Sequence, residues 1–163
     1  MKPKFMLLIF ICFLTGCKEY ASNHSPQIKN GIQMSKRMKI DELKSSLEKL
    51  ENGQTEFEFI GITSNGEDCI YFVIEEGKFS IEYEAIIENQ IAFLDKLKDF
   101  SKLNNLETEL RTYNNKAQYK SNQPAPVLRI KAKANIDEIA ILGESIQNRI
   151  FNNSKETTYD IVP

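Results

Sequence analysis

The sequence of 163 residues has few of the side chains from which familiar enzyme sites are built. It contains no tryptophan, a single histidine, His24, and seven glycines that are scattered one at a time. Since the histidine lies in a polar stretch near the N-terminus, Ser-His and Cys-His nucleophiles have no base, and the usual zinc sites lack ligands. Isolated glycines also exclude a glycine-rich phosphate loop. We therefore expect no catalytic residue, no metal site and no cofactor.

Carboxylates are the one catalytic chemistry that the composition leaves open, because two carboxyl groups can act as a general acid and a general base. Glutamates do recur in pairs, but each pair is explained more simply by the exposed side of a strand or by a turn. An enzyme that uses carboxylates alone is therefore the least favoured alternative. The pairs are Glu56 with Glu58, Glu75 with Glu76, and Glu107 with Glu109.

The chain also lacks an excess of positive charge. It has 21 lysines and arginines against 23 aspartates and glutamates. Nucleic-acid binding depends on a concentrated basic surface, which this balance does not favour. We expect no nucleic-acid partner.

Long hydrophobic runs are absent except for one near the N-terminus, from Phe5 to Leu14, which follows Lys2 and Lys4. This run is too short for a mature membrane-spanning helix and is typical of a signal peptide. The residues that close it, Leu14-Thr15-Gly16-Cys17, resemble a bacterial lipobox. The resemblance implies that residues 1–16 are removed, that lipid such as palmitate is attached to Cys17, and that the protein is held in the cell envelope. An ordinary secretory signal with a chance cysteine is the alternative.

The residue after the lipobox cysteine bears on which membrane holds the protein. Lys18 stands where an aspartate commonly retains such lipoproteins in the inner membrane, so the outer membrane is favoured if the organism has two. Of the other cysteines, Cys12 lies in the segment that would be removed. Cys69 lies in an apolar run, which predicts a buried structural thiol, with a reactive or intermolecular thiol as the alternative.

Composition divides the remaining chain into a tether and one domain. Residues 17–38 are polar and show no sustained period, so we expect a flexible tether. Residues 39–163 are enough for a single domain. Its first element is predicted to be a helix over residues 39–51, followed by three strands over residues 55–63, 69–75 and 79–84. Asn65-Gly66 predicts a type I′ hairpin, and Glu76-Gly77 predicts a second turn.

The middle of the domain changes from a helical to an alternating pattern. Residues 85–103 predict an amphipathic helix and residues 106–113 a half-exposed strand. Residues 114–126 lack a period and predict a long loop, which is either a partner-binding surface or a plain connection between strands. The candidate partner-binding residues at this loop are Tyr113, Lys116, Tyr119 and Lys120.

The C-terminal part predicts a strand, a helix and a strand. Residues 127–133 alternate; Asn135 and Glu138 form a capping-box pattern before the helix; and residues 157–162 form the last strand. If the two strands lay side by side, they would run parallel through a right-handed crossover. The segment Val127 to Arg149 resembles the strand-helix region of the periplasmic domains of TolR- and ExbD-type proteins, which have a similar Val-Leu-Arg-Ile strand. This resemblance implies a small α+β shape and no activity.

Together these patterns predict an α+β fold with a mixed sheet of about five or six strands and two or three packed helices, in the order α-β-β-β-α-β-β-α-β. The absence of catalytic groups and the lipobox predict a membrane-anchored envelope lipoprotein with a non-enzymatic domain that binds a protein. An immunity lipoprotein that neutralises a toxin is the alternative.

Overall fold

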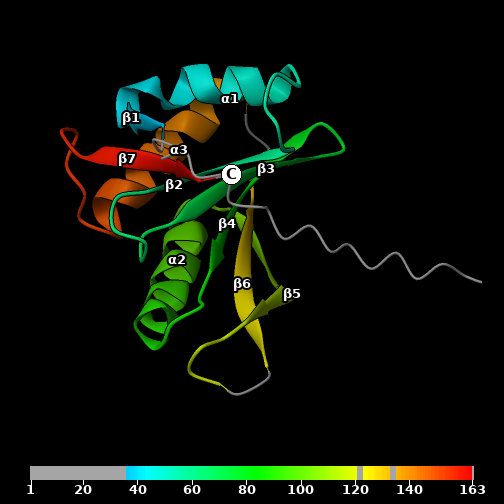
Figure 1. The fold of residues 1–163 in the computed structure, drawn as a ribbon, viewed down its shortest axis with the longest axis vertical. Helices are drawn as coiled ribbons and strands as arrows, with labels where there is room; N and C mark the ends of the chain where they lie inside the picture. Colours follow the sequence, from blue (N-terminus) through cyan, green and yellow to red (C-terminus); the bar gives the residue numbers. More distant parts are fainter. Residues whose placement is uncertain (1–35, 121–122, 133–134, 163) are drawn as a thin grey trace, which may run out of the picture. The chain divides into compact units, whose positions relative to one another are not determined.

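The computed structural model describes residues 36–120, 123–132 and 135–162, which form one seven-stranded antiparallel sheet and three α-helices (Figure 1). The strand order in the sheet is β1-β7-β2-β3-β4-β6-β5. The strands are β1 (Arg37–Lys39), β2 (Phe59–Thr63), β3 (Ile70–Glu75), β4 (Lys78–Glu84), β5 (Glu107–Lys116), β6 (Pro124–Lys131) and β7 (Thr158–Val162). The helices are α1 (Leu43–Glu51), α2 (Ile91–Leu103) and α3 (Ile136–Arg149), with 3-10 turns before α1 (Ile40–Glu42) and before α2 (Glu88–Gln90).

The predicted α+β class is confirmed, with one strand more than expected. The additional strand is β1, which pairs with β7 and buries Met38. The predicted tether boundary at residue 38 was therefore too late, because Arg37 and Met38 already belong to the sheet. A three-residue strand is too short to show an alternating pattern, so the sequence carries no signal for it.

The pairing of the two C-terminal strands differs from a compact βαβ unit. β6 lies between β4 and β5, whereas β7 lies between β1 and β2. The two strands point the same way but are separated by β2, β3 and β4, so the sheet is antiparallel throughout and not mixed. The intervening helix α3 spans the central strands, which lets β7 reach the far side of the sheet. Local sequence patterns do not report such a distant pairing.

The chain reverses at both predicted turns, but the type I′ geometry occurs at Glu76-Gly77 and not at Asn65-Gly66. Glu76 and Gly77, between β3 and β4, both have positive φ, at 52° and 72°, as a type I′ turn requires. At Asn65-Gly66 only Gly66 has positive φ, at 85°. The expected tight turn there is wrong, because the carboxylate of Asp68 accepts backbone and side-chain hydrogen bonds and holds a longer loop from Ser64 to Cys69.

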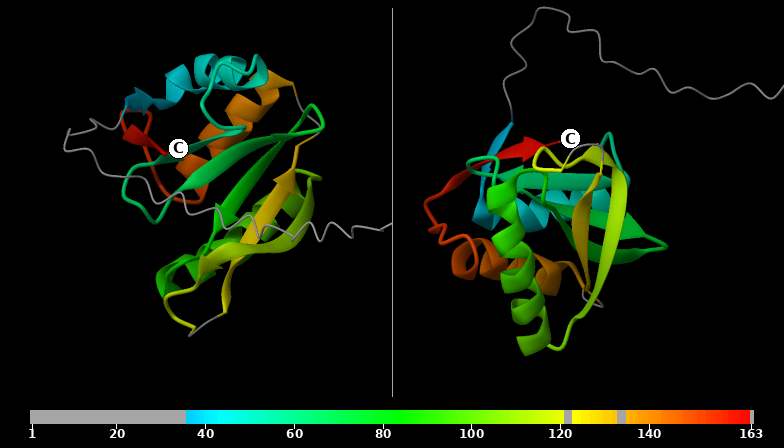
Figure 2. Two further views of the ribbon diagram at one scale, coloured as in Figure 1. Left: turned by 45° about the vertical axis from the view of Figure 1, so that its right-hand side comes forward. Right: turned by 90° about the horizontal axis from the view of Figure 1, so that it is seen from below.

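The three helices pack on one face of the sheet. α1 and α3 lie side by side there (Figure 2), and Gly143 of α3 lies against Phe72 of β3. α2 contacts the same face, since Tyr83 of β4 packs against both Phe93 of α2 and Phe151 after α3. No residue of β5 is buried, whereas alternate residues of β2, β3, β4 and β6 join this core. Its fully buried large side chains include Phe72, Tyr83, Ile62, Ile70, Ile81, Leu128 and Ile130.

Helix positions follow the sequence closely, although the second helix starts later than predicted. The capping box at α3 is confirmed: the Glu138 amide donates to Asn135 Oδ1 at 3.0 Å, and the Asn135 amide donates to the Glu138 carboxylate at 3.4 Å. α2 begins at Ile91 rather than near Ala85. The Gln90 side chain accepts hydrogen bonds from the amides of Ile86 and Ile87, which keeps those residues extended.

The predicted loop at residues 114–126 is shorter in the structure. β5 continues to Lys116, and β6 begins at Pro124. The register between these strands shifts between Thr112 and Lys116. Such an irregularity changes which face the following side chains occupy and so removes the period of two, which explains why the sequence pattern predicted a loop.

Gly143 provides a direct test of the helix packing. A Cβ atom there would lie 2.6 Å from Phe72 Cζ and 3.0 Å from Leu43 Cδ2. We expect Gly143→Ala to lower the free energy of unfolding by about 1–2 kcal/mol, because the overpacking cost exceeds the gain in helix propensity. Urea unfolding measures this change. Ile141→Ala, at an exposed position of the same helix, is the control, and equal stability of the two variants would contradict the packing.

Candidate functional site

The candidate site lies on the other face of the sheet, which none of the described helices covers. Alternation along the strands places polar side chains here, including Glu75 of β3, Glu82 of β4 and Arg129 of β6. Glu82 lies directly opposite Arg129, which in turn lies opposite Glu109 of β5. The face is therefore built by residues from four neighbouring strands.

A buried ionic network forms the centre of this face. The guanidinium of Arg129 donates to the carboxylates of both Glu82 and Glu75, and it also donates to the Tyr113 hydroxyl at 3.3 Å. Tyr113 Oη in turn donates to Glu82 at 2.8 Å. Only 4% of the Arg129 side chain and 7% of the Glu82 side chain are exposed. Because buried charges are stable only when they are paired and hydrogen-bonded, this network fixes the shape of the face.

The pKa values of these side chains shift in the directions that their surroundings predict. Burial alone would lower the pKa of Arg129, but the hydrogen bonds to Glu75 and Glu82 outweigh it and raise the pKa. The hydrogen bond from Arg129 holds the pKa of the more exposed Glu75 below its ordinary value. Burial, together with the bond to Glu82, raises the pKa of Tyr113. At neutral pH the centre therefore holds a charged Arg129, a charged Glu75 and a neutral Tyr113.

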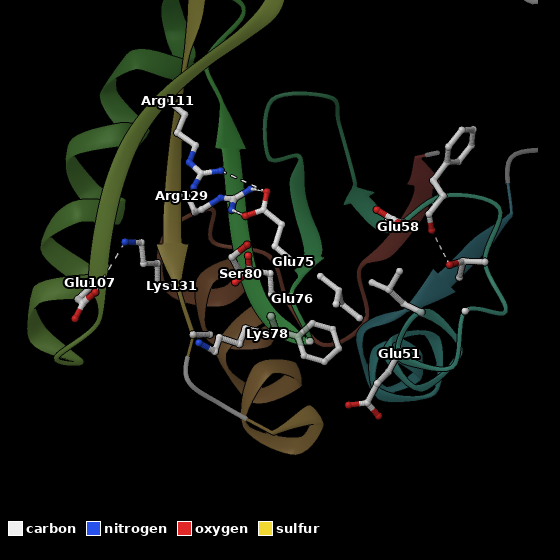
Figure 3. Close-up of a pocket in the computed structure, with 18 of the residues that line it drawn as sticks. Glu51, Glu58, Glu75, Glu76, Lys78, Ser80, Glu107, Arg111, Arg129 and Lys131 are labelled. Atoms are coloured by element: carbon white, nitrogen blue, oxygen red, sulfur yellow. Dashed lines mark hydrogen bonds and ion pairs between the residues drawn. The ribbon is translucent and has the colours of Figure 1, made fainter.

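A second arginine continues the network toward solvent. Arg111 of β5 approaches Glu75 at 3.4 Å and Glu109 at 3.2 Å, and Lys131 approaches Glu109 at 3.6 Å. The hydrogen bond from Arg111 lowers the pKa of Glu109. Glu75 thus bridges the buried Arg129 and the outer Arg111 (Figure 3).

Glu75, Arg111 and Arg129 of this network line a groove with a volume of about 1110 Å³. In Figure 3, Arg111, Arg129, Lys131 and Glu107 lie toward one side of the groove, with Glu75 beside the two arginines, and Glu51 and Glu58 lie toward the other. Phe57, Phe79 and Ile74 add apolar surface. The buried Ser80 also lines the groove, and its hydroxyl has no hydrogen-bond partner among the residues that the structure describes. The groove therefore has ion-paired charges of both signs on one side, carboxylates on the other, and apolar side chains among its lining residues.

An aromatic surface continues the face beyond the groove. The rings of Phe57 and Phe59 stack at 5.5 Å, and Phe59 meets Tyr71 edge to face at 5.9 Å. Gly61 makes room for the Tyr71 ring, because a Cβ atom at this position would lie 2.7 Å from Tyr71 Cε1. Phe57 keeps 43% of its surface exposed, so part of this cluster is available for contact.

The four residues predicted to bind a partner are not brought together in the groove. Tyr113 lines a separate hollow of about 380 Å³ with Glu82, Glu84 and other residues of the same face. The Tyr119 hydroxyl donates to the Ala85 carbonyl at 3.1 Å, so it ties the end of β5 to β4. Lys116 and Lys120 are exposed. Their role in partner binding stays a prediction.

Sequence analysis missed the buried arginine and glutamate at the centre. Arg129 and Glu82 both occur at the polar positions of alternating strands, which are ordinarily exposed. The available signal was their charge complementarity on strands of similar length, but it becomes informative only once β4 and β6 are known to be neighbours.

Cys69 lies just before β3 and is partly exposed. Burial raises its pKa to about 11, so the thiol is protonated at neutral pH, as an unreactive structural cysteine would be. The lipobox and its Cys17 lie outside the described residues. Within residues 36–120, 123–132 and 135–162, no three His, Cys, Asp or Glu side chains are grouped so that they could hold a metal ion.

None of the helices in the described part of the chain is long and apolar enough to cross a bilayer. Comparison of the chain with protein-family models, curated proteins and solved structures gave no match.

Proposed function

We propose that this protein is a lipid-anchored protein of the bacterial cell envelope whose domain binds another protein without catalysing a reaction. The lipobox-like Leu14-Thr15-Gly16-Cys17 supports the anchor, with lipid on Cys17. The groove, which is lined by residues of the sheet and by Leu50 and Glu51 of α1, supports the binding role, and it is the observation that carries the proposal.

The groove has the properties of a protein-binding surface. Its floor is held by the Arg129 network, so little side-chain freedom is lost there when a partner binds. It combines exposed aromatic surface at Phe57 with arginines and glutamates at its edges, and aromatic residues and arginine are the side chains enriched in protein interfaces. The carboxylates on one side of the groove and the ion-paired charges on the other would orient a partner with a complementary arrangement of charge.

The polar groups of the groove also favour binding over catalysis. Arg129, Arg111 and Glu75 are engaged in ion pairs with one another or with neighbouring carboxylates. The Cys69 thiol is protonated, and the described residues include no histidine to serve as a base. These groups hold a shape rather than present an activated nucleophile.

Affinity capture from the organism's own envelope fraction tests the groove. The full chain is compared with Phe57→Asp, which puts a charge at an exposed aromatic position of the groove, and with Ile141→Asp, which does the same at an exposed position of α3. We expect Phe57→Asp to lose the captured partner, with affinity falling about tenfold or more, because an aromatic contact at an interface is replaced by a charge. Ile141→Asp should retain it.

One further variant makes the capture decisive. Tyr119→Ala tests whether the partner binds at the end of the β5–β6 hairpin instead of in the groove. Loss of the partner in this variant but not in Phe57→Asp would show that the hairpin is the binding surface. A captured partner that is retained equally by all three variants would contradict binding through either surface.

A further inference from the structure

The outer edge of the sheet at β5 is the longest exposed strand edge of the described structure. β5 contains ten residues, and β6 is its only neighbour among the described strands, so no described strand lies beside the other edge of its interior residues, Thr108 to Asn115. The opposite edge strand, β1, has only three residues. An edge as long as β5 is a ready template for pairing with another chain, and soluble proteins ordinarily protect such edges.

Exposed apolar side chains gather at the same edge. Of the five large hydrophobic side chains that are exposed in the described structure, two belong to β5 and one to the end of α2 just before it. These are Leu110 with 59% of its surface exposed, Tyr113 with 44% and Leu103 with 83%. An interface that covered the middle of β5 would remove Leu110 from water, which favours association.

β5 carries charges of both signs near its middle, so a second copy of the strand can lie beside it with opposite charges facing each other. Glu109 and Arg111 lie on one face of the strand and are 3.2 Å apart at their nearest charged atoms, while Leu110 between them points to the other face. The strand pairs regularly with β6 from Glu107 to Thr112 and becomes irregular only after Thr112. The regular stretch is therefore centred close to Leu110.

We propose that β5 pairs antiparallel with β5 of a second copy of this chain, about a two-fold axis at Leu110, so that the two sheets join edge to edge. In this register Leu110 meets its own equivalent. Glu109 of each copy lies opposite Arg111 of the other, and Thr108 lies opposite Thr112. Cross-strand pairs of opposite charge, and of two threonines, are stabilising.

The neighbouring registers are less favourable. An axis at Glu109 would place two glutamates directly opposite each other, and an axis at Arg111 would do the same with two arginines. Like charges directly opposite one another destabilise paired strands. The register at Leu110 is therefore selected by the sequence of β5 itself, and a symmetric dimer needs only this one strand from each copy.

A charge-exchange experiment tests the proposed register. The full chain is solubilised in mild detergent, and the protein mass of each particle is measured by light scattering after size-exclusion chromatography, across a range of concentrations. We expect the wild type to form dimers. Glu109→Arg and Arg111→Glu should each raise the dissociation constant by about tenfold or more, because each creates two like-charge pairs across the two-fold axis.

Mixing the two variants supplies the decisive result. In an equimolar mixture of Glu109→Arg and Arg111→Glu, every facing pair regains opposite charges, so heterodimers should form at wild-type concentrations. The double exchange in one chain should restore dimers as well. A merely structural effect of either substitution on the monomer would not be repaired by mixing.

Two further variants complete the test. Asp95→Arg reverses the charge of an exposed carboxylate on α2 and should leave the dimer unchanged. Leu110→Lys places like charges on the axis at an exposed position where folding does not depend on the side chain, and it should give monomers. The proposal is overturned if the wild type stays monomeric, if the charge variants remain dimeric, or if mixing fails to restore dimers.

Discussion

Replacing Arg129 by methionine is expected to lower the free energy of unfolding by about 3–5 kcal/mol, the cost of removing one partner of a buried ion pair. Methionine preserves most of the side-chain volume but leaves the Glu82 carboxylate, of which only 7% is exposed, without its arginine. The Tyr113 hydroxyl, which donates to Glu82 at 2.8 Å, cannot neutralise that charge. Urea unfolding followed by circular dichroism measures the loss.

The second partner of the pair distinguishes burial of charge from loss of packing. Replacing Glu82 by methionine in the Arg129→Met chain should restore most of the stability, because a buried ion pair and an apolar pair of similar volume differ little in net stability. Arg111→Met is the control at the edge of the same network, where 30% of the side chain is exposed, and it should cost under about 1 kcal/mol. Equal losses in Arg129→Met and Arg111→Met would mean that the network is open to water.

Replacing Asp68 by alanine is expected to lower the free energy of unfolding by about 3–4 kcal/mol, because several donors lose a charged acceptor at a site where the residue is only 1% exposed. The carboxylate accepts from Thr63 Oγ1 at 2.6 Å, the Ser64 amide at 2.9 Å and Asn153 Nδ2 at 2.6 Å. It therefore joins the β2–β3 loop to the segment after α3. Thermal unfolding measures the effect, and a loss below about 1 kcal/mol would contradict this role.

The same carboxylate predicts a dependence of stability on pH. Burial alone would raise the pKa of Asp68, but the hydrogen bonds from Ser64, Thr63 and Asn153 outweigh it and hold the pKa below its ordinary value. The unfolded chain therefore binds this proton at higher pH than the folded protein does. The contribution of Asp68 is complete above the unfolded pKa of about 4 and is lost as the pH falls through the folded pKa.

Asp68→Asn isolates this contribution. The amide keeps the shape of the side chain and one acceptor oxygen, so the variant should be less destabilised than Asp68→Ala. Its free energy of unfolding should fall less steeply below about pH 4 than that of the wild type, because the amide does not titrate. Parallel curves for Asp68→Asn and the wild type would contradict the lowered pKa.

Elements with strong local patterns could be predicted from the sequence. The buried stripe of α1, with Leu43, Leu47 and Leu50, follows from helical spacing alone. The capping box of α3 follows from Asn135 and Glu138. In both cases residues within one or two turns determine the structure, so neighbouring positions carry the information.

The candidate site could not be predicted, because it depends on contacts between distant strands. Arg129 and Glu82 are 47 positions apart and become neighbours only when β6 pairs with β4. β7 reaches its place beside β2 only through the crossover at α3. Period-two alternation correctly predicted that Arg129 lies on the polar face of its strand. Alternation does not report that Tyr113 and neighbouring carboxylates bury the side chain there.

Asp68 was missed for a different reason. Asn65-Gly66 is a strong local signal for a tight hairpin, and a tight hairpin would leave no structural role for the carboxylate of Asp68. The hydrogen bonds of Asp68 to Thr63 and Ser64 are local, but the bond to Asn153 joins residues 85 positions apart. The loop is therefore held partly by a contact for which a single sequence has no local signal.

Intact mass measurement of the protein extracted from its own membranes tests the central proposal most directly. If the lipobox-like segment is processed as proposed, the chain begins at Cys17 and carries the added mass of lipid on that residue. The Cys17→Ser chain should lack the lipid and leave the membrane fraction. A wild-type chain that begins elsewhere, or begins at Cys17 with no added mass, would contradict the proposed anchor.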